Sequence, residues 1–148
     1  MSDNPRWVRN GELARSSRPG YPDRDVGPES VAGWLRQVRG MGIRSVVVLL
    51  TDEEISSYYS RLPDGLLGLY RQSGLRVKHI PIRDPAHYPE GYEELRENLG
   101  RIYEAFKELP KPVLIHCSAG CDRTGRAVDW IQERLASAAA DGGPSVRP

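Results

Sequence analysis

One segment constrains the fold more than any other: a short apolar strand that leads through a glycine-containing loop into a helix. The run Val113-Leu-Ile-His116 is typical of a buried strand. The loop Cys117-Ser-Ala-Gly-Cys-Asp-Arg123 follows, and a helix is expected to start near Thr124. A loop this short can curl so that its backbone N–H groups point to one centre, where the helix N-terminus adds a positive field. The segment therefore predicts an anion-binding loop at the end of a strand.

The rest of the chain alternates between strand and helix patterns. Further strands are expected over residues 45–50 and 75–82, and a small hairpin over residues 7–15 turns at Asn10-Gly11. Further helices are expected to begin near Pro28, Thr51, Leu66 and Glu90, and the run Thr51-Asp-Glu-Glu54 resembles a capping box. This order predicts an α/β fold with a central, mostly parallel sheet of four to five strands flanked by helices. We expect one domain over residues 1–148, with residues 136–148 as a disordered tail.

Composition and charge argue against several classes of protein. The 21 Lys and Arg residues balance 20 Asp and Glu residues, which gives no indication of nucleic-acid binding. No apolar run is long enough for a membrane span, and the first residues lack the apolar core of a signal peptide. Two neighbouring cysteines and three histidines form neither a disulfide framework nor a zinc site. We therefore expect a cytoplasmic protein without a metal or other cofactor.

Two side chains of the loop have the chemistry of phosphoryl transfer. A helix N-terminus and a nearby cation lower the pKa of a cysteine, so Cys117 is expected to be a thiolate that can attack phosphorus. The planar guanidinium of Arg123 can hold two phosphate oxygens at once. The expected substrate-binding residues are Ser118, Ala119, Gly120, Cys121, Asp122 and Arg123.

The same reaction needs a proton donor for the departing oxygen. Asp84 is the expected general acid, because it lies in a proline-flanked loop just beyond a predicted strand. Asp122, inside the loop itself, is the alternative. Thr124 can donate its hydroxyl to the sulfur of Cys117 and so help the thiolate leave from a phosphocysteine intermediate. His116 is expected to fix the loop through a hydrogen bond rather than to touch the substrate.

The run from His116 to Thr124 resembles the signature of the protein tyrosine phosphatase superfamily, in which five residues separate the cysteine from the arginine. The spacing from Asp84 to Cys117, and the run Leu13-Ala-Arg-Ser-Ser-Arg-Pro19, resemble the compact dual-specificity branch.

This resemblance implies a dual-specificity phosphatase-like fold and a metal-independent mechanism through phosphocysteine. It also implies that Cys117 is the nucleophile, Arg123 the phosphate ligand, Asp84 the acid and Thr124 the stabiliser of the leaving thiolate. The implied substrates are phosphorylated proteins or small phosphomonoesters, with phosphotyrosine first and phosphoserine or phosphothreonine in addition.

Several alternatives stay open at this stage. The loop is similar to one in bacterial phosphatases that act on phosphotyrosine and phosphoinositides, but Cys121 stands where those have Lys. Phosphoinositides are therefore the alternative substrate. A rhodanese-like sulfurtransferase also uses a loop cysteine, although Arg123-Thr124 argues against it. A weak phosphate-binding module would be favoured only if Cys117 or Arg123 were missing.

Other side chains have two interpretations each. Cys121 is either inert or able to form a reversible disulfide with Cys117. Arg15, Arg18 and Arg24 are either solvated charges or contacts for an anionic substrate. Compact members of the superfamily usually carry further helices after the last one expected here. The fold is therefore either minimal or covered by a partner chain, and the oligomeric state stays open.

Overall fold

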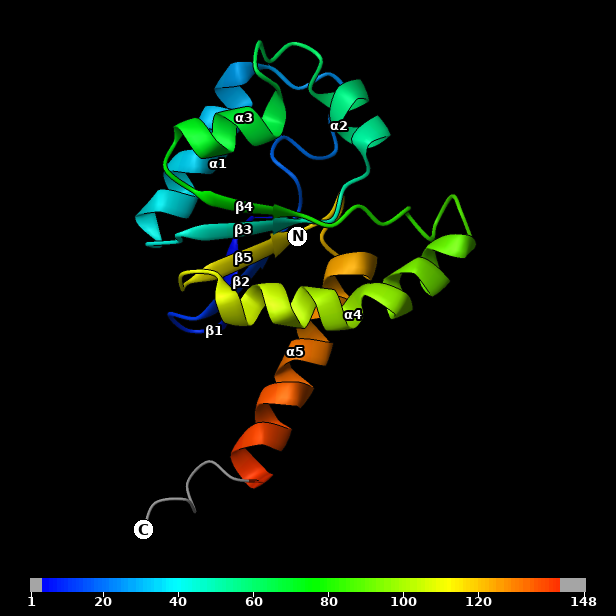
Figure 1. Cartoon of the computed structure of the whole chain (residues 1–148). Coiled ribbons are helices and arrows are strands. Elements are labelled where there is room, and N and C mark those ends of the chain that lie inside the picture. Colours follow the sequence, from blue (N-terminus) through cyan, green and yellow to red (C-terminus); the bar gives the residue numbers. More distant parts are fainter. Residues whose placement is uncertain (1–3, 142–148) are drawn as a thin grey trace.

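The computed structural model describes residues 4–141 and has three layers, with a five-stranded sheet between two groups of helices (Figure 1). In chain order the elements are β1 (Arg6–Arg9), β2 (Leu13–Ser16), α1 (Pro28–Gly40), β3 (Ser45–Val48), α2 (Asp52–Tyr58), α3 (Gly65–Gln72), β4 (Arg76–His79), α4 (Glu90–Glu108), β5 (Val113–His116) and α5 (Asp122–Asp141). The expected α/β fold with a mostly parallel sheet of four to five strands is confirmed, and the sheet has five.

The strand order brings three loops to one edge of the sheet. The order is β1-β2-β5-β3-β4, in which only the β1–β2 hairpin is antiparallel. The last residues of β2 and β3, Ser16 and Val48, both pair with His116 at the end of β5. The segments that follow these strands therefore start side by side at the carboxyl edge, where open α/β sheets bind their ligands.

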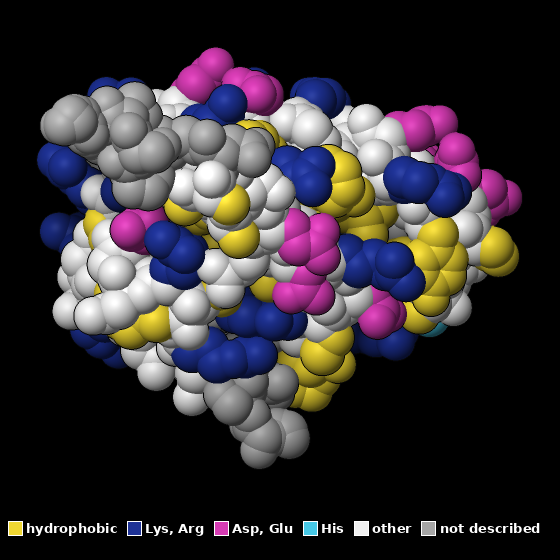
Figure 2. All heavy atoms as spheres, turned by 90° about the horizontal axis from the view of Figure 1, so that it is seen from below, with side chains coloured by type: hydrophobic (Ala, Val, Ile, Leu, Met, Phe, Trp, Pro, Cys, Tyr) yellow, Lys and Arg dark blue, Asp and Glu magenta, His cyan; other side chains and the backbone are white. Residues whose placement is uncertain are grey.

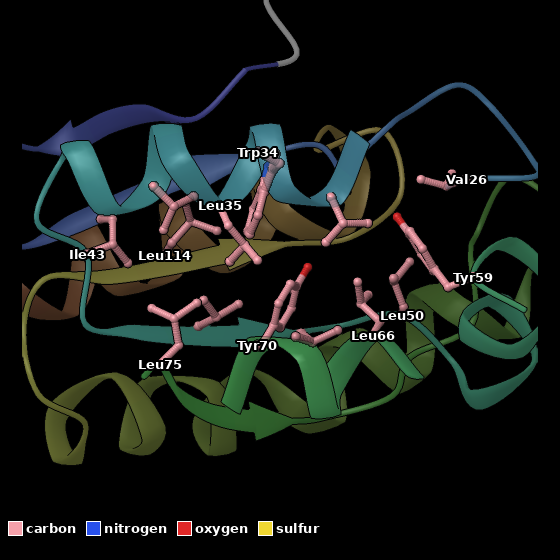
Figure 3. Close-up of a cluster of buried hydrophobic side chains, with 14 of the residues drawn as sticks. Val26, Trp34, Leu35, Ile43, Leu50, Tyr59, Leu66, Tyr70, Leu75 and Leu114 are labelled. Atoms are coloured by element: carbon pink, nitrogen blue, oxygen red, sulfur yellow. The ribbon is translucent and has the colours of Figure 1, made fainter. Parts of the chain in front are cut away.

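Each face of the sheet buries alternate side chains under different helices. In β3, Val46 and Val48 pack in one core cluster with α1 and α3, whereas Val47 packs in the other with α4 and α5. Trp34 and Tyr70 stack in the middle of the first cluster, with ring centroids 5.4 Å apart (Figure 3). Because both faces are covered, the central strands are continuous apolar runs instead of alternating ones.

Local signals explain where the helices begin. Pro28 stands in the first turn of α1, where its missing N–H costs nothing. At α2, the Thr51 hydroxyl accepts a hydrogen bond from the Glu54 N–H at 3.2 Å, and the Glu54 carboxylate accepts one from the Thr51 N–H at 2.8 Å. This reciprocal pair is the predicted capping box.

Several boundaries differ from the sequence expectation. Strand β3 ends at Val48, two residues before the predicted end at residue 50. Strand β4 ends at His79, although the Ile80 N–H donates to the Val48 carbonyl at 2.9 Å and the Ile82 N–H to the Leu49 carbonyl at 3.1 Å. Pro81 lies between these two donors on the edge strand, where its missing N–H removes no bond to β3. The prediction of a disordered tail is wrong for residues 136–141, because α5 continues to Asp141. Alanine has the highest helix propensity, so this Ala-rich stretch extends the helix. The rest of the predicted tail, residues 142–148, lies outside the described residues.

The side of the molecule below the sheet carries mixed charge. Figure 2 shows Lys and Arg side chains interspersed with Asp, Glu and hydrophobic ones on this side. Neither sign dominates it. No described helix is both long and apolar enough to cross a membrane.

Candidate active site

Cys117 lies directly after β5 and lines a cavity of about 290 Å³ at the carboxyl edge of the sheet. Its side chain is only 2% exposed. The loop over residues 117–123 borders the same cavity through Ser118, Ala119, Asp122 and Arg123. Among the backbone–backbone hydrogen bonds of the described residues outside helices and strands, none is donated by residues 118–121. A loop whose N–H groups make no such bond has the donors that an anion-binding nest uses.

Strand β2 and the residues just after it hold this loop through hydrogen bonds. The Arg18 N–H donates to the Ser118 carbonyl at 2.8 Å, and Nη2 of Arg15 donates to the Gly120 carbonyl at 2.7 Å. Gly120 has a φ of +80°, and a Cβ there would lie 2.7 Å from the Ser16 carbonyl oxygen. Only glycine fits both this conformation and this close approach.

Arg123 is almost fully buried, and Glu54 holds its guanidinium. Nη1 donates to Glu54 Oε1 at 2.8 Å and to the Ile82 carbonyl at 2.8 Å, and Nη2 donates to Glu54 Oε2 at 3.0 Å. A guanidinium has five N–H groups, so the Nε–H and one N–H of Nη2 are left over. These two lie on one edge of the guanidinium and form a fork that matches two phosphate oxygens.

The surroundings of Arg123 also stabilise its charge. Burial lowers the pKa of Arg123, but the hydrogen bonds that it donates to Glu54 and the charges of Cys117, Glu54 and Asp84 outweigh burial and raise the pKa above its ordinary value. Sequence reasoning assigned Glu54 only to the capping box and missed this contact. Its position just after β3, at the same edge as the loop, is the signal that could have found it.

Both candidate acids reach the cavity. Asp84 is half-buried: its Oδ1 accepts from the Ala86 N–H at 3.0 Å, and its Oδ2 lies 3.6 Å from Nη2 of Arg123. Gly91 at the start of α4 packs against the same segment, because a Cβ there would lie 2.2 Å from the Arg83 carbonyl oxygen. Asp122 lines the same cavity from the first turn of α5, with an exposed side chain.

His116 is buried behind the loop and holds its first residue. Its Nδ1 lies 3.0 Å from the Cys117 carbonyl oxygen, which can only accept, so Nδ1 carries the hydrogen. Its Nε2 then accepts from the Tyr70 hydroxyl at 2.8 Å. Burial is the largest cause that lowers the pKa of His116 to about 4, so the ring is neutral near pH 7. The predicted hydrogen bond to the loop is present, and Tyr70 is the partner that sequence reasoning missed.

Thr124 and Cys121 differ in burial. Thr124 is fully buried, and among residues 4–141 its hydroxyl has no hydrogen-bond partner, the sulfur of Cys117 included. The hydroxyl is therefore available to donate. Cys121 is exposed, with its sulfur 3.9 Å from the Ala119 carbonyl oxygen, and both cysteines are free thiols.

Part of the cavity lining is aromatic and cationic. Tyr21 and Tyr58 line the cavity together with Arg18 and Arg24. Arg18 is buried, whereas Arg24 is exposed at the rim. A second cavity of about 340 Å³ adjoins the first and shares Tyr58, Asp84 and His87 with it. The described residues contain no group of three or more His, Cys, Asp and Glu side chains that could hold a metal ion.

Known proteins resemble this chain in family and in fold. A profile of the tyrosine phosphatase family matches residues 2–139. No curated protein matches the sequence. The solved catalytic core of Siw14 is similar to the fold, with a TM-score of 0.52 and 20% identity over 91% of this chain and 68% of that chain. TpbA from P. aeruginosa, in complex with phosphotyrosine, has a TM-score of 0.40 and 21% identity over 93% of this chain and 76% of its own. Since the family profile spans most of its length, the chain belongs to the tyrosine phosphatase family and is a cysteine-based phosphatase.

Proposed function

We propose that the chain hydrolyses phosphomonoesters in two steps through a phosphocysteine intermediate, with Cys117 as the nucleophile. Phosphotyrosine is the first proposed substrate, and phosphoserine and phosphothreonine are further ones, as in the dual-specificity branch. One observation carries this proposal. Cys117, with its buried thiol, lines the same cavity as the loop residues Ser118 and Ala119 and the buried Arg123.

In the first step the sulfur of Cys117 attacks phosphorus, and the bond from phosphorus to the leaving oxygen breaks. The loop N–H groups and the fork of Arg123 bind the three non-bridging oxygens and stabilise their charge in the transition state. Asp84 gives its proton to the leaving oxygen. Its carboxyl group lies 3.6 Å from the guanidinium of Arg123, which supports this role.

In the second step water attacks the phosphocysteine and the S–P bond breaks. Asp84, now a carboxylate, takes a proton from the water, and inorganic phosphate leaves. The sulfur departs as a thiolate, to which the Thr124 hydroxyl can donate. The absence of any other partner for this buried hydroxyl among the described residues supports that role.

Two residues act through others in this scheme. Glu54 keeps the guanidinium of Arg123 turned so that its free edge meets the phosphate. His116, neutral and bonded to Tyr70, holds the carbonyl of Cys117 and so the start of the loop. Neither side chain needs to change its protonation during turnover.

The cavity walls support the choice of substrate. Tyr21 and Tyr58 offer aromatic surface to a phenyl ring. Arg18 and Arg24 favour a substrate with further negative charge, which keeps phosphoinositides as the alternative. We further propose that the chain works as one catalytic domain in the cytoplasm, where its free thiols stay reduced. The proposed partner is a phosphorylated protein or small phosphomonoester, not nucleic acid.

Hydrolysis of an aryl phosphate tests the proposal. Wild type should turn over, Cys117→Ser should lose all measurable activity, and Asp84→Asn should lose about 10²- to 10⁴-fold in kcat. Asp122→Asn is the matched control, because it removes a carboxylate that lines the same cavity. Inactive wild type refutes the phosphatase assignment, and a loss in Asp122→Asn without one in Asp84→Asn moves the acid into the loop. Parallel assays with phosphoserine peptides, phosphoinositides and thiosulfate separate the substrate classes.

A further inference from the structure

A second hollow lies far from the catalytic loop. The parallel strands β3 and β4 start at the edge of the sheet opposite that loop (Figure 1), and a cavity of about 390 Å³ lies at this edge. Among the described residues that line it, the charged ones are Arg39, Arg44 and Arg76, and all three side chains are exposed. Arg39 belongs to the last turn of α1, Arg44 directly precedes β3, and Arg76 begins β4. We call this cavity the amino-edge hollow.

The three arginines of the amino-edge hollow have no acidic partner. Within residues 4–141, no carboxylate forms an ion pair with any of them. The sequence explains why: residues 30–51 and 65–83 contain no Asp or Glu, and they supply every lining residue except Pro110. Because the whole chain has nearly balanced charge, this excess of positive charge is a local feature of the amino edge.

Two helix ends offset part of this positive charge. Helices α1 and α3 both end beside the hollow, where Nη1 of Arg39 donates to the Ser73 carbonyl at 3.1 Å. Each helix C-terminus is equivalent to roughly half a negative charge. Three guanidinium groups therefore leave about two positive charges without compensation. A phosphate monoester carries about 1.5 to 2 negative charges at pH 7 and matches this excess better than a single carboxylate does.

The donors that remain in the hollow belong to side chains. The backbone N–H groups of Gly42 and Gly74 already bond to the last turns of α1 and α3, at 2.9 and 3.0 Å. The guanidinium groups of Arg44 and Arg76 have no protein acceptor among the described residues. Each therefore keeps the five N–H groups of an arginine, which can hold phosphate oxygens in pairs. A ligand in this hollow would thus be recognised by its charge and its oxygen atoms.

We propose that the amino-edge hollow is a second anion site, in which Arg39, Arg44 and Arg76 bind a phosphate monoester group. The 4 residues of β3, which span about 13 Å, separate this site from the catalytic edge, so the phosphate bound here is not the one that is hydrolysed. The inference does not depend on the proposed hydrolysis. A phosphorylated side chain of a protein and a small phosphate compound share this chemistry, and the test distinguishes them.

Nuclear magnetic resonance of the ¹⁵N-labelled chain tests the proposal, with methylphosphonate as a probe that is not hydrolysed. The titration is run above the second pKa of the probe and in about 0.15 M salt, where exposed charges further apart than about 8 Å are screened. The amide signals of Gly42 and Gly74 report on the amino-edge hollow, and that of Gly120 reports on the catalytic loop. All three should shift and saturate, and acetate should bind more weakly at Gly42 and Gly74.

A pair of double variants identifies the side chains responsible. Arg44→Gln with Arg76→Gln should raise the Kd read at Gly42 about tenfold or more, as expected when charge-assisted hydrogen bonds are lost. The Kd read at Gly120 should stay within twofold. Arg36→Gln with Arg71→Gln is the matched control, because these exposed arginines lie in the same acid-free segments but do not line the hollow.

Three results overturn the proposal. The first is a wild-type shift at Gly42 and Gly74 that does not saturate, or that acetate reproduces with the same Kd. The second is an unchanged Kd at Gly42 in the variant of the lining arginines, and the third is an equal loss in the control variant. The wild-type titration decides even if a variant does not fold, and it needs no turnover. A peptide with a phosphonate analogue of phosphoserine then separates the sources: tighter binding than methylphosphonate at Gly42 indicates a phosphorylated protein, and equal or weaker binding indicates a small compound.

Discussion

Replacing Glu54 by glutamine tests whether this carboxylate prepares Arg123 for phosphate. The two carboxylate oxygens accept from Nη1 at 2.8 Å and from Nη2 at 3.0 Å. A glutamine side chain keeps one acceptor oxygen and turns an NH₂ group toward the other guanidinium nitrogen, so one charge-assisted bond is lost. Such a bond contributes about 1.5–3 kcal/mol. If the transition state loses this stabilisation in full, kcat/KM for an aryl phosphate should fall roughly 10- to 150-fold.

The capping box supplies the control for this experiment. Glu54 also caps α2, so part of any loss in Glu54→Gln could come from the helix start instead of from Arg123. Thr51→Ala removes the other half of the cap and leaves the ion pair with Arg123 in place. It should cost about 1 kcal/mol in the free energy of unfolding and change kcat/KM less than threefold.

Two readouts separate these causes. Steady-state kinetics with an aryl phosphate give kcat/KM, and urea unfolding shows how far each variant remains folded under the assay conditions. The inhibition constant for inorganic phosphate should rise in Glu54→Gln, because the free edge of the Arg123 guanidinium that binds the substrate also binds this product. The reasoning is refuted if Glu54→Gln keeps kcat/KM within threefold of wild type, or if both variants lose it by the same factor.

Three further predictions concern other parts of the site. The depressed pKa of His116, about 4 against 6.5 when unfolded, stabilises the fold above pH 6.5, and this stabilisation is lost as the pH falls toward 4. Urea unfolding should show about 2 kcal/mol lost between pH 7 and 5 in wild type, and a clearly smaller loss in His116→Asn. Gly91→Ala should displace the loop of Asp84 and lower kcat about tenfold or more, with little change in the inhibition constant for phosphate, because its Cβ would lie 2.2 Å from backbone. Cys121→Ser should regain activity after peroxide and thiol treatment as wild type does, since Cys121 is exposed and Cys117 buried; a variant that stays inactive would establish the disulfide instead.

Much of the fold could be predicted because its signals are local. The apolar run of β5, the capping box at Thr51 and the periodicity of α4 each depend on neighbours within a few residues of the chain. The loop over residues 117–123 is equally local, so its cysteine, arginine and glycine could be recognised together. The prediction of a tail from residue 136 is wrong as far as Asp141, because alanine is a strong helix former and α5 continues through this stretch.

The sequence by itself determined the chemistry: a cysteine and an arginine in one short loop, with a strand before it and a helix after it. Only the tertiary structure decided which distant residues complete the site. Glu54, Arg18 and Tyr70 are separated from the loop by 46 residues or more, and hydrogen bonds bring them to Arg123, Ser118 and His116. The order of the parallel strands determines which segments meet at the site, because it places the ends of β2, β3 and β5 at one edge of the sheet. No local sequence pattern predicts that order, because it depends on how strands far apart in the chain pack together.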